Sequence, residues 1–150
     1  MRIGATADIE VVANVACALS AWIDFNANGD WSDADEDIFS GQGLVAGVNN
    51  LSFAVPAGAV LGMTYARFRC TTDGAVPFTG QASDGEVEDY RVRIACLADL
   101  DGSGKVNLAD LSILLSQWGQ CAGCPADLNG NGWVNLADLS ILVSQWGNCP

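Results

Sequence analysis

The sequence predicts a two-domain protein, with an all-β sandwich over residues 1–95 and a small all-α domain over residues 96–150. Three observations support this prediction. Alternating apolar and polar residues recur in the first part, a segment is duplicated in the second, and each copy has helical periodicity.

Short alternating runs separated by glycine-rich turns fill the first part. Leu51, Phe53 and Val55 alternate with smaller or polar neighbours, and the same period of two recurs over residues 66–70 and 90–94. Residues 9–25 predict one or two further strands. A period of two places alternate side chains on one face of a strand, so these runs predict antiparallel sheets packed as a sandwich.

The second part is a duplication. Residues 96–121 and 124–149 are identical at 20 of 26 aligned positions. Each copy carries apolar residues at i, i+3, i+4 and i+7, which is one face of a helix, and a glycine follows as a helix stop. We interpret this face as core packing. Its members are Leu111, Leu114, Leu115 and Trp118 in the first copy and Leu139, Leu142, Val143 and Trp146 in the second.

A calcium-loop pattern, D-x-[DN]-x-[DNS]-G-x-V-N-x-x-D, precedes each helix. Alternate residues of such a loop turn oxygen atoms inward, a glycine at position 6 permits the sharp turn, and position 7 offers its backbone carbonyl. The predicted ligands are Asp99, Asp101, Ser103, Lys105 and Asp110 in the first loop and Asp127, Asn129, Asn131, Trp133 and Asp138 in the second.

Every Asp of residues 96–150 lies at one of these ligand positions, and no Glu occurs there. A merely solvated surface would scatter its carboxylates. We therefore expect two calcium ions in the C-terminal domain.

The loop and the L-x-x-L-L-x-x-W helix resemble the type I dockerin family over residues 97–147. The resemblance implies two antiparallel helices, a calcium ion in each loop and attachment to a cohesin-like partner domain. Dockerin positions 10 and 11 contact cohesin. Here the Ser-Thr pair typical of those positions is replaced by Leu108, Ala109, Leu136 and Ala137.

Four cysteines bracket the two repeats, and three pairings of them exist. The antiparallel arrangement of the dockerin family favours Cys96–Cys149 with Cys121–Cys124, and pairing within each repeat is the alternative. The symmetric placement favours structural disulfides over a redox or zinc role for the C-x-x-C segment.

A second acidic loop, in the first domain, repeats the calcium-loop spacing without a helix after it. Its predicted ligands, for one further calcium ion, are Asp24, Asn26, Asn28, Asp30 and Glu36, with Asp35 an alternative closing residue. Residues 84–90, D-G-E-V-E-D-Y, add four carboxylates. These carboxylates either help to hold a cation or pair with Arg67, Arg69, Arg91 and Arg93.

Together, A-W-I-D-F-N-x-N-G-D-W and D-G-E-V-E-D-Y resemble the GEVED domain over roughly residues 10–95. The resemblance implies a β-rich accessory domain of large secreted proteins. Cys17 and Cys70 both fall on predicted strands, and a disulfide between them is expected if these strands adjoin.

The formal net charge of −12 argues against nucleic-acid binding and against anionic membrane surfaces, and no apolar run is long enough to span a membrane. Six cysteines indicate an oxidising compartment, although Asp8 and Glu10 interrupt any signal peptide. We therefore expect an extracellular or cell-surface fragment of a longer protein; its oligomeric state is left open.

The absence of His and of nucleophile–base motifs argues against an enzyme. We expect a secreted, non-catalytic, calcium-binding module that attaches an extracellular, polysaccharide-degrading protein or assembly to a cohesin-like partner. The alternatives are a fragment of a secreted glycoside hydrolase, whose catalytic domain lies upstream, and a structural cell-surface protein stabilised by calcium.

Overall fold

The structure is a computed structural model that describes residues 1–148, with the side chain of residue 148 left aside. The chain divides into two compact units, and the boundary lies between Ile94 and Ala95, with Arg2 grouped with the second unit. Within the described residues, no helix has the length and apolar character needed to cross a membrane.

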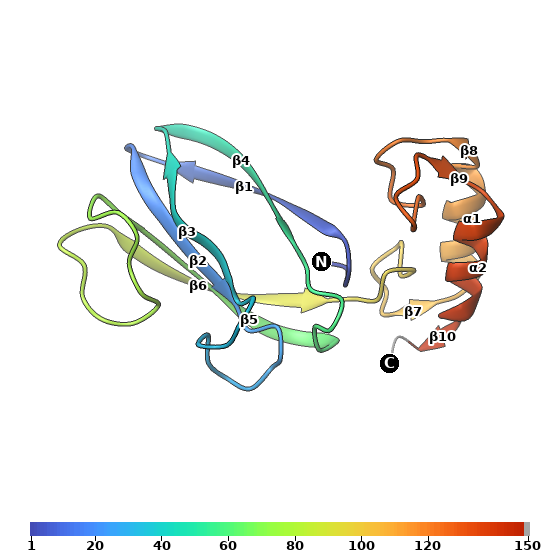
Figure 1. The fold of residues 1–150 in the computed structure, drawn as a ribbon, viewed down its shortest axis with the longest axis horizontal. Coiled ribbons are helices and arrows are strands. Elements are labelled where there is room, and N and C mark those ends of the chain that lie inside the picture. The colour runs from blue at the N-terminus through green and yellow to red at the C-terminus, as the bar shows by residue number, and fades with distance from the viewer. Residues whose placement is uncertain (149–150) are drawn as a thin grey trace. The chain divides into compact units, whose positions relative to one another are not determined.

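Six strands build the first unit in two sheets (Figure 1). One sheet has two strands, in the order β1-β4, and the other has four, in the order β3-β2-β5-β6, with every pairing antiparallel. The strands are β1 (Thr6–Ala13), β2 (Cys17–Ile23), β3 (Asp37–Leu44), β4 (Gly47–Ala54), β5 (Gly62–Thr71) and β6 (Glu86–Ile94). The predicted all-β architecture is therefore present.

The core of the first unit lies between the two sheets. Ile23 and Ala66 from the four-stranded sheet and Phe53 from β4 are buried together, and Ile9 of β1 packs against them. Alternation produces this arrangement in β1 as well, where it was not predicted, because β1 places every second residue toward the core and leaves the others exposed.

The outer face of the four-stranded sheet is partly covered by the loop over residues 72–85. Arg69 is buried beneath it, and its guanidinium donates hydrogen bonds to the carbonyls of Pro77, Thr79 and Gly80. A buried guanidinium needs such acceptors, so Arg69 fixes the loop and is not paired with the acidic residues 84–90 by any described hydrogen bond.

A disulfide joins Cys17 of β2 to Cys70 of β5, with a Cα–Cα distance of 5.9 Å. The two strands are neighbours, and Ala18 pairs with Thr71 next to the bridge. The disulfide expected between Cys17 and Cys70 is therefore confirmed, because the two strands that carry them adjoin.

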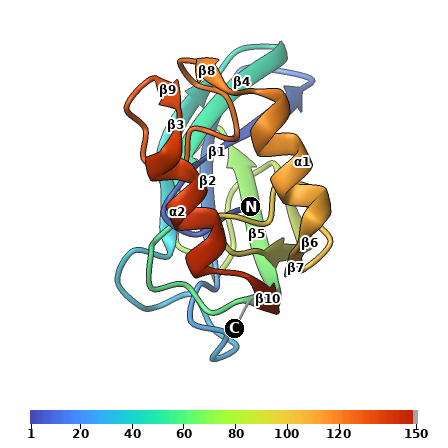
Figure 2. The same cartoon turned by 90° about the vertical axis from the view of Figure 1, so that its right-hand side faces the viewer.

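The second unit contains two nine-residue helices, α1 (Leu108–Ser116) and α2 (Leu136–Ser144). Each begins with an asparagine N-cap and a capping box closed by the aspartate at the third helical position. Figure 2 shows the two helices side by side.

Short pairings tie the start of each repeat to the end of the other. The partners are β7 (Lys105–Val106) with β10 (Gly147–Asn148), and β8 (Gly119–Gln120) with β9 (Trp133–Val134). The side-chain carbonyl of Gln145 accepts a hydrogen bond from Ala98 N at 3.1 Å, and that of Gln117 accepts one from Ala126 N at 3.3 Å. The prediction of an all-α domain missed these two-residue strands, which are too short to show a period.

The predicted core face of each helix is only half confirmed, with Leu111 and Leu139 partly buried. Only Leu114 and Leu142 are fully buried, whereas Leu115 is 52% exposed and Trp118 is 46% exposed. Val143 and Trp146 in the second repeat are exposed to a similar degree. The unit is small, and buried apolar residues of its loops and short strands, such as Val106 and Val134, fill the rest of its core, so only one apolar position per helix is fully buried.

In the second unit Cys121 and Cys124 form a disulfide. Cys96 is buried, and its favoured partner, Cys149, lies outside the described residues.

Candidate metal centres

The loop over residues 99–110 is organised by the carboxylate of Asp110, which is fully buried at the first turn of α1. One of its oxygens accepts hydrogen bonds from the amides of Leu100 and Asp101, at 2.8 and 3.1 Å. The other accepts from Asn107 N at 2.8 Å. The Asp110 carboxylate therefore holds the beginning and the end of the loop together through hydrogen bonds.

Asp99 is the second buried carboxylate of this loop, with 2% of its surface exposed. Its Oδ2 accepts from Gly104 N at 2.8 Å, whereas its Oδ1 is buried without a hydrogen-bond partner. Burying a charged oxygen without a partner is costly, so this atom calls for a cation or a water.

Carboxylate oxygens of Asp99, Asp101 and Asp110 converge within 4.8 Å of one another. The amide and hydroxyl of Ser103 beside Asp101 hold the pKa of that exposed carboxyl below its usual range, so it stays charged. Ser103 Oγ also donates to the Lys105 carbonyl at 3.3 Å, which places those two predicted ligands side by side. Three carboxylates converge here, and one oxygen of the Asp99 carboxylate has no hydrogen-bond partner. Such a donor set suits a hard divalent cation.

The loop over residues 127–138 repeats this geometry around Asp138 but not at its first ligand, because Asp127 is only half-buried and its Oδ1 accepts from Asn131 N at 3.0 Å. Asp138 is buried and accepts from the amides of Leu128, Asn129 and Asn135, and Asp127 accepts from Gly132 N at 2.7 Å. Asn129 and Asn131 replace the second carboxylate and the serine of the first loop. Their side-chain carbonyls accept backbone amide hydrogen bonds, and Asn131 accepts one from Trp133 N at 2.9 Å.

The acidic loop of the first unit follows β2. Asp24 is buried and accepts from the amides of Asn28 and Gly29, at 3.1 and 3.0 Å. The side chains of Asn26 and Asn28 accept from backbone amides two residues later, so each predicted ligand in this stretch folds back on its own loop.

A cluster of Asp30, Asp33 and Glu36 closes this loop, with one carboxylate oxygen from each within 4.8 Å of the others. Glu36 is 1% exposed, and burial raises the pKa of its carboxyl. Asp35, the alternative closing residue, is exposed and has a positive φ of 69°.

Asp33 is the residue that the sequence analysis missed. Its carboxylate accepts from the side-chain amides of Asn26 and Asn28, at 2.9 and 2.6 Å. The sequence does contain a signal for Asp33, because Asp30, Asp33 and Glu36 follow one another at intervals of three residues.

The acidic residues 84–90 do not join that cluster within the described residues. Asp84 instead accepts from both the hydroxyl and the amide of Thr72 and from the hydroxyl of Thr71. Glu86 and Glu88 lie exposed on β6.

Asp89 forms an ion pair with Arg67, through hydrogen bonds of 2.7 and 2.6 Å. This pairing lowers the pKa of the Asp89 carboxyl. The Arg67 guanidinium carbon also lies 4.5 Å from the centre of the Trp31 ring. One arginine therefore connects the two sequence signatures, and the part of the signature that touches it has a structural role.

The predicted partner-binding residues lie at the start of the two helices. Leu108 and Leu136 are each 69% exposed, and Ala109 and Ala137 beside them are exposed as well.

Comparison with known proteins gives a family match to the GEVED domain over residues 18–93, slightly more than half of the chain. No curated protein matches the chain, and neither does any solved structure.

Proposed function

The chain belongs to the GEVED domain family, and we propose that it is a secreted, non-catalytic protein that carries a calcium-dependent docking module of the dockerin type behind this domain. In this proposal the second unit holds two calcium ions and attaches an extracellular, polysaccharide-degrading protein or assembly to a cohesin-like partner.

The observation that carries the proposal is the buried, unpartnered Oδ1 of Asp99. It belongs to a loop whose three carboxylates converge, and calcium takes six to eight oxygen ligands at such sites. Asp99, Asp101, Ser103, the Lys105 carbonyl and Asp110 would hold the ion. The same positions of the second repeat, from Asp127 to Asp138, would hold the other.

The acidic loop of the first unit is proposed as a third calcium site. Asp30, Asp33 and Glu36 bring carboxylate oxygens within 4.8 Å of one another, and Asp24, Asn26 and Asn28 have the loop spacing of calcium ligands. Its role is to stabilise the domain, because the loop connects β2 with β3.

The proposed docking surface is the exposed start of each helix. Leu108 and Leu136 are apolar, about two-thirds exposed and lie on helices whose first turns are fixed by capping boxes. Exposed apolar side chains on a rigid element suit a protein interface. Calcium would act on this surface indirectly, through Asp110 and Asp138 in the first turn of each helix.

Calorimetric titration of calcium into the chelator-treated, oxidised chain tests the metal sites. The variant to compare is Asp99→Asn with Asp127→Asn, which keeps side-chain size but removes one charge per loop. Variants at Asp110 are less informative, because that carboxylate also caps a helix. Asp8→Asn, exposed on β1, is the matched control.

We expect two or three ions in the parent and the control, and two fewer or two much weaker sites in the double variant. Equal uptake by the parent and the double variant would contradict the proposed tail sites.

Retention on an immobilised cohesin domain, with calcium or with chelator, tests the docking role. We expect calcium-dependent retention that falls about tenfold or more in Leu108→Ser with Leu136→Ser. Val60→Ser, exposed in the first unit, should leave it unchanged. Intact calcium binding without retention by cohesin-like domains would instead support the structural cell-surface role.

A further inference from the structure

The two sheets of the first unit are unequal, and the two-stranded sheet leaves part of its partner uncovered. β4 follows β3 across a two-residue turn and contacts it, so the β1-β4 sheet begins above the β3 edge. β1 is then the last strand of the smaller sheet, while β6 ends the larger one. The inner face of β6 therefore lacks an opposite strand over its first half, whereas Val92 and Ile94 in its second half pack in the core.

The register of β6 shows which side chains lie on that inner face. Glu86, Glu88 and Tyr90 pair with Cys70, Phe68 and Ala66, and these three β5 residues face the core. Residues directly opposite each other in an antiparallel pair share a face. Two glutamates and a tyrosine thus point inward yet are exposed, with Tyr90 51% exposed.

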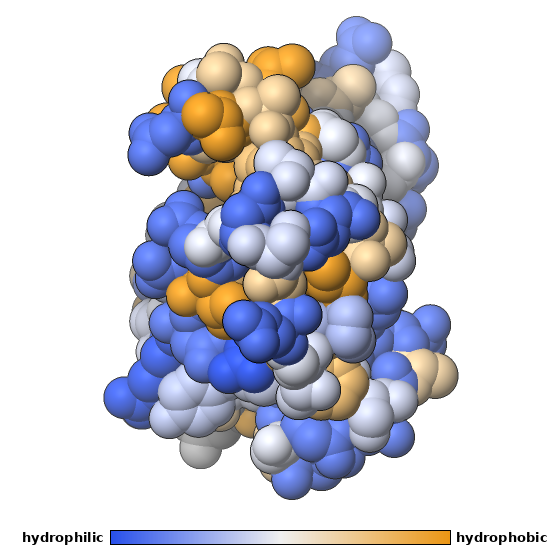
Figure 3. Space-filling view, turned by 90° about the vertical axis from the view of Figure 1, so that its left-hand side faces the viewer, coloured by the Kyte–Doolittle hydropathy of each residue, from blue (hydrophilic) through white to orange (hydrophobic). Residues whose placement is uncertain are grey.

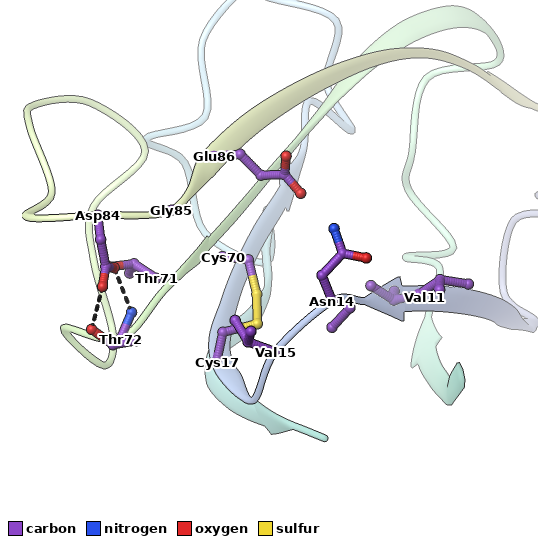
Figure 4. Close-up of a pocket in the computed structure, with 12 residues that line it drawn as sticks. Val11, Asn14, Val15, Cys17, Cys70, Thr71, Thr72, Asp84, Gly85 and Glu86 are labelled. Atoms are coloured by element: carbon purple, nitrogen blue, oxygen red, sulfur yellow. Dashed lines mark hydrogen bonds between the residues drawn. A yellow bond between two sulfur atoms is a disulfide. The ribbon is translucent and has the colours of Figure 1, made fainter. Parts of the chain in front are cut away.

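Two adjoining hollows of about 400 and 330 Å³ lie between β1 and β6 and share Val11, Val12, Cys70 and Glu86. In Figure 4 the second hollow is lined by Glu86, by Val11 and Asn14, and by the Cys17–Cys70 disulfide below Glu86. Exposed valines, Val12 and Val15, continue the apolar surface to the end of the sandwich, where Figure 3 shows apolar side chains gathered. We call this feature the β1–β6 groove.

The β1–β6 groove combines an apolar floor with an acidic rim. Ile9, Val11 and Phe68 line the floor, and Glu10, Glu86 and Glu88 line the rim, with Arg91 as the cation of the lining. The excess of carboxylates favours a ligand with several positive charges.

We propose that the β1–β6 groove binds an extended, basic segment of another protein, which adds as a strand to the free edge of β1. Such a strand would lie over the inner face of β6 and complete the smaller sheet. Lys or Arg side chains at alternate positions would bury their stems on the apolar floor and place their charged ends at Glu86 and Glu88.

Charge argues against a second copy of this chain as the occupant. A copy that added through its own β1 would bring Asp8 and Glu10 next to the same residues of the first, and like charges across strands are unfavourable. The basic segment must therefore come from a different protein.

The test uses the full chain and an acetylated, amidated eight-residue peptide that alternates Lys and Val and matches β1 in length. Affinity is measured by calorimetry, and backbone amide shifts and exchange locate the peptide. The same peptide with Glu in place of Lys controls for charge. Two further versions, N-methylated on alternate residues, each block one hydrogen-bonding edge.

We expect binding with slowed amide exchange on β1, and loss of binding with the Glu peptide and with one of the two methylated peptides. Glu86→Gln with Glu88→Gln should weaken binding by at least about fivefold, from two half-exposed charge pairs. Asp35→Asn with Asp37→Asn removes two charges at the opposite edge of the sheet and should leave the affinity unchanged.

Several results would overturn the proposal: no binding, equal weakening by both double variants, shifts confined to α1 and α2, or self-association through β1 that excludes the peptide. None of these outcomes depends on calcium uptake by the tail, so the docking proposal stands or falls separately.

Discussion

Gly85 is the residue of the 84–90 signature whose identity the backbone dictates. Its φ is +92°, and a Cβ added there would lie 1.8 Å from the carbonyl oxygen of Cys70. Neither the conformation nor the space admits a side chain, so a glycine is required where the chain passes β5 to begin β6.

We predict that Gly85→Ala destabilises the first unit by about 3 kcal/mol or more, because it adds a clash with backbone to the cost of a positive φ. Gly80→Ala is the matched control, since Gly80 has a φ of +90° and open space around it. Denaturant unfolding should show a much smaller loss of unfolding free energy in Gly80→Ala than in Gly85→Ala. Equal losses of stability in the two variants would mean that the positive φ alone, and not the close approach of the Cys70 carbonyl, requires glycine at position 85.

Asp84 connects the same signature to the acid stability of the unit. Hydrogen bonds from Thr72 and Thr71 hold the pKa of its carboxyl below the ordinary value. A carboxyl whose folded pKa is depressed contributes stability that is present above its unfolded pKa and is lost as the pH falls through the folded value.

We therefore predict that the first unit loses stability as the pH falls below about 4, the unfolded pKa of an aspartate. Asp84→Asn should make the stability less dependent on pH in that acidic range, because the variant has no proton to take up there. Denaturant midpoints measured at intervals of pH check this. Parallel profiles for the parent and the variant would contradict it.

At the scale of the element, the strands and the loop-helix units follow from short-range patterns. Alternation over residues 51–55 and 66–70 marks the core faces of β4 and β5, and the apolar residues at i, i+3, i+4 and i+7 mark the two helices. These features depend on a few neighbouring residues, so the sequence alone predicts them.

Features that depend on distant surfaces could not be predicted in this way. The apolar stripe at Leu115 and Trp118 does not say how large a surface opposes it, and here that surface leaves both residues about half exposed. The exposure of Glu86 and Glu88 on the inward face likewise depends on the number of strands in the opposite sheet. Asp33 joins its cluster through hydrogen bonds with two asparagines of the loop.

The two tail loops differ in charge, and calcium affinity rises with the number of charged ligands. The first loop has carboxylates at positions 1, 3 and 12, whereas Asn129 replaces the carboxylate at position 3 of the second. We predict that Asn129→Asp tightens calcium binding in the second loop, by up to about tenfold. Titration calorimetry of the parent and the variant measures the change. An unchanged weaker site would show that Asn129 is no ligand.

At the scale of the whole molecule, the two units rely on different supports. The disulfide of the first unit spans 53 residues, a separation for which loop-closure entropy amounts to about 4 kcal/mol. In the second unit, saturating calcium at a hundred times its dissociation constant would add about 2.7 kcal/mol per independent site.

We predict that these supports can be removed one at a time. Cys17→Ala with Cys70→Ala should lower the melting temperature of the first unit only, and chelation of calcium should lower that of the second unit more than that of the first. Scanning calorimetry, with and without chelator, follows both transitions. A chelator that shifted the two transitions equally would show that the third proposed calcium site, after β2, stabilises the first unit as strongly.

The contact between Gln145 and Ala98 places the two ends of the second unit next to each other. A segment whose ends meet can be inserted into a surface turn of a host as readily as it can be fused to a terminus, because neither position requires the host to open. Recombination could therefore transfer the repeat pair between unrelated proteins as an intact cassette. A single repeat could not be transferred in this way, because each needs the other to close it.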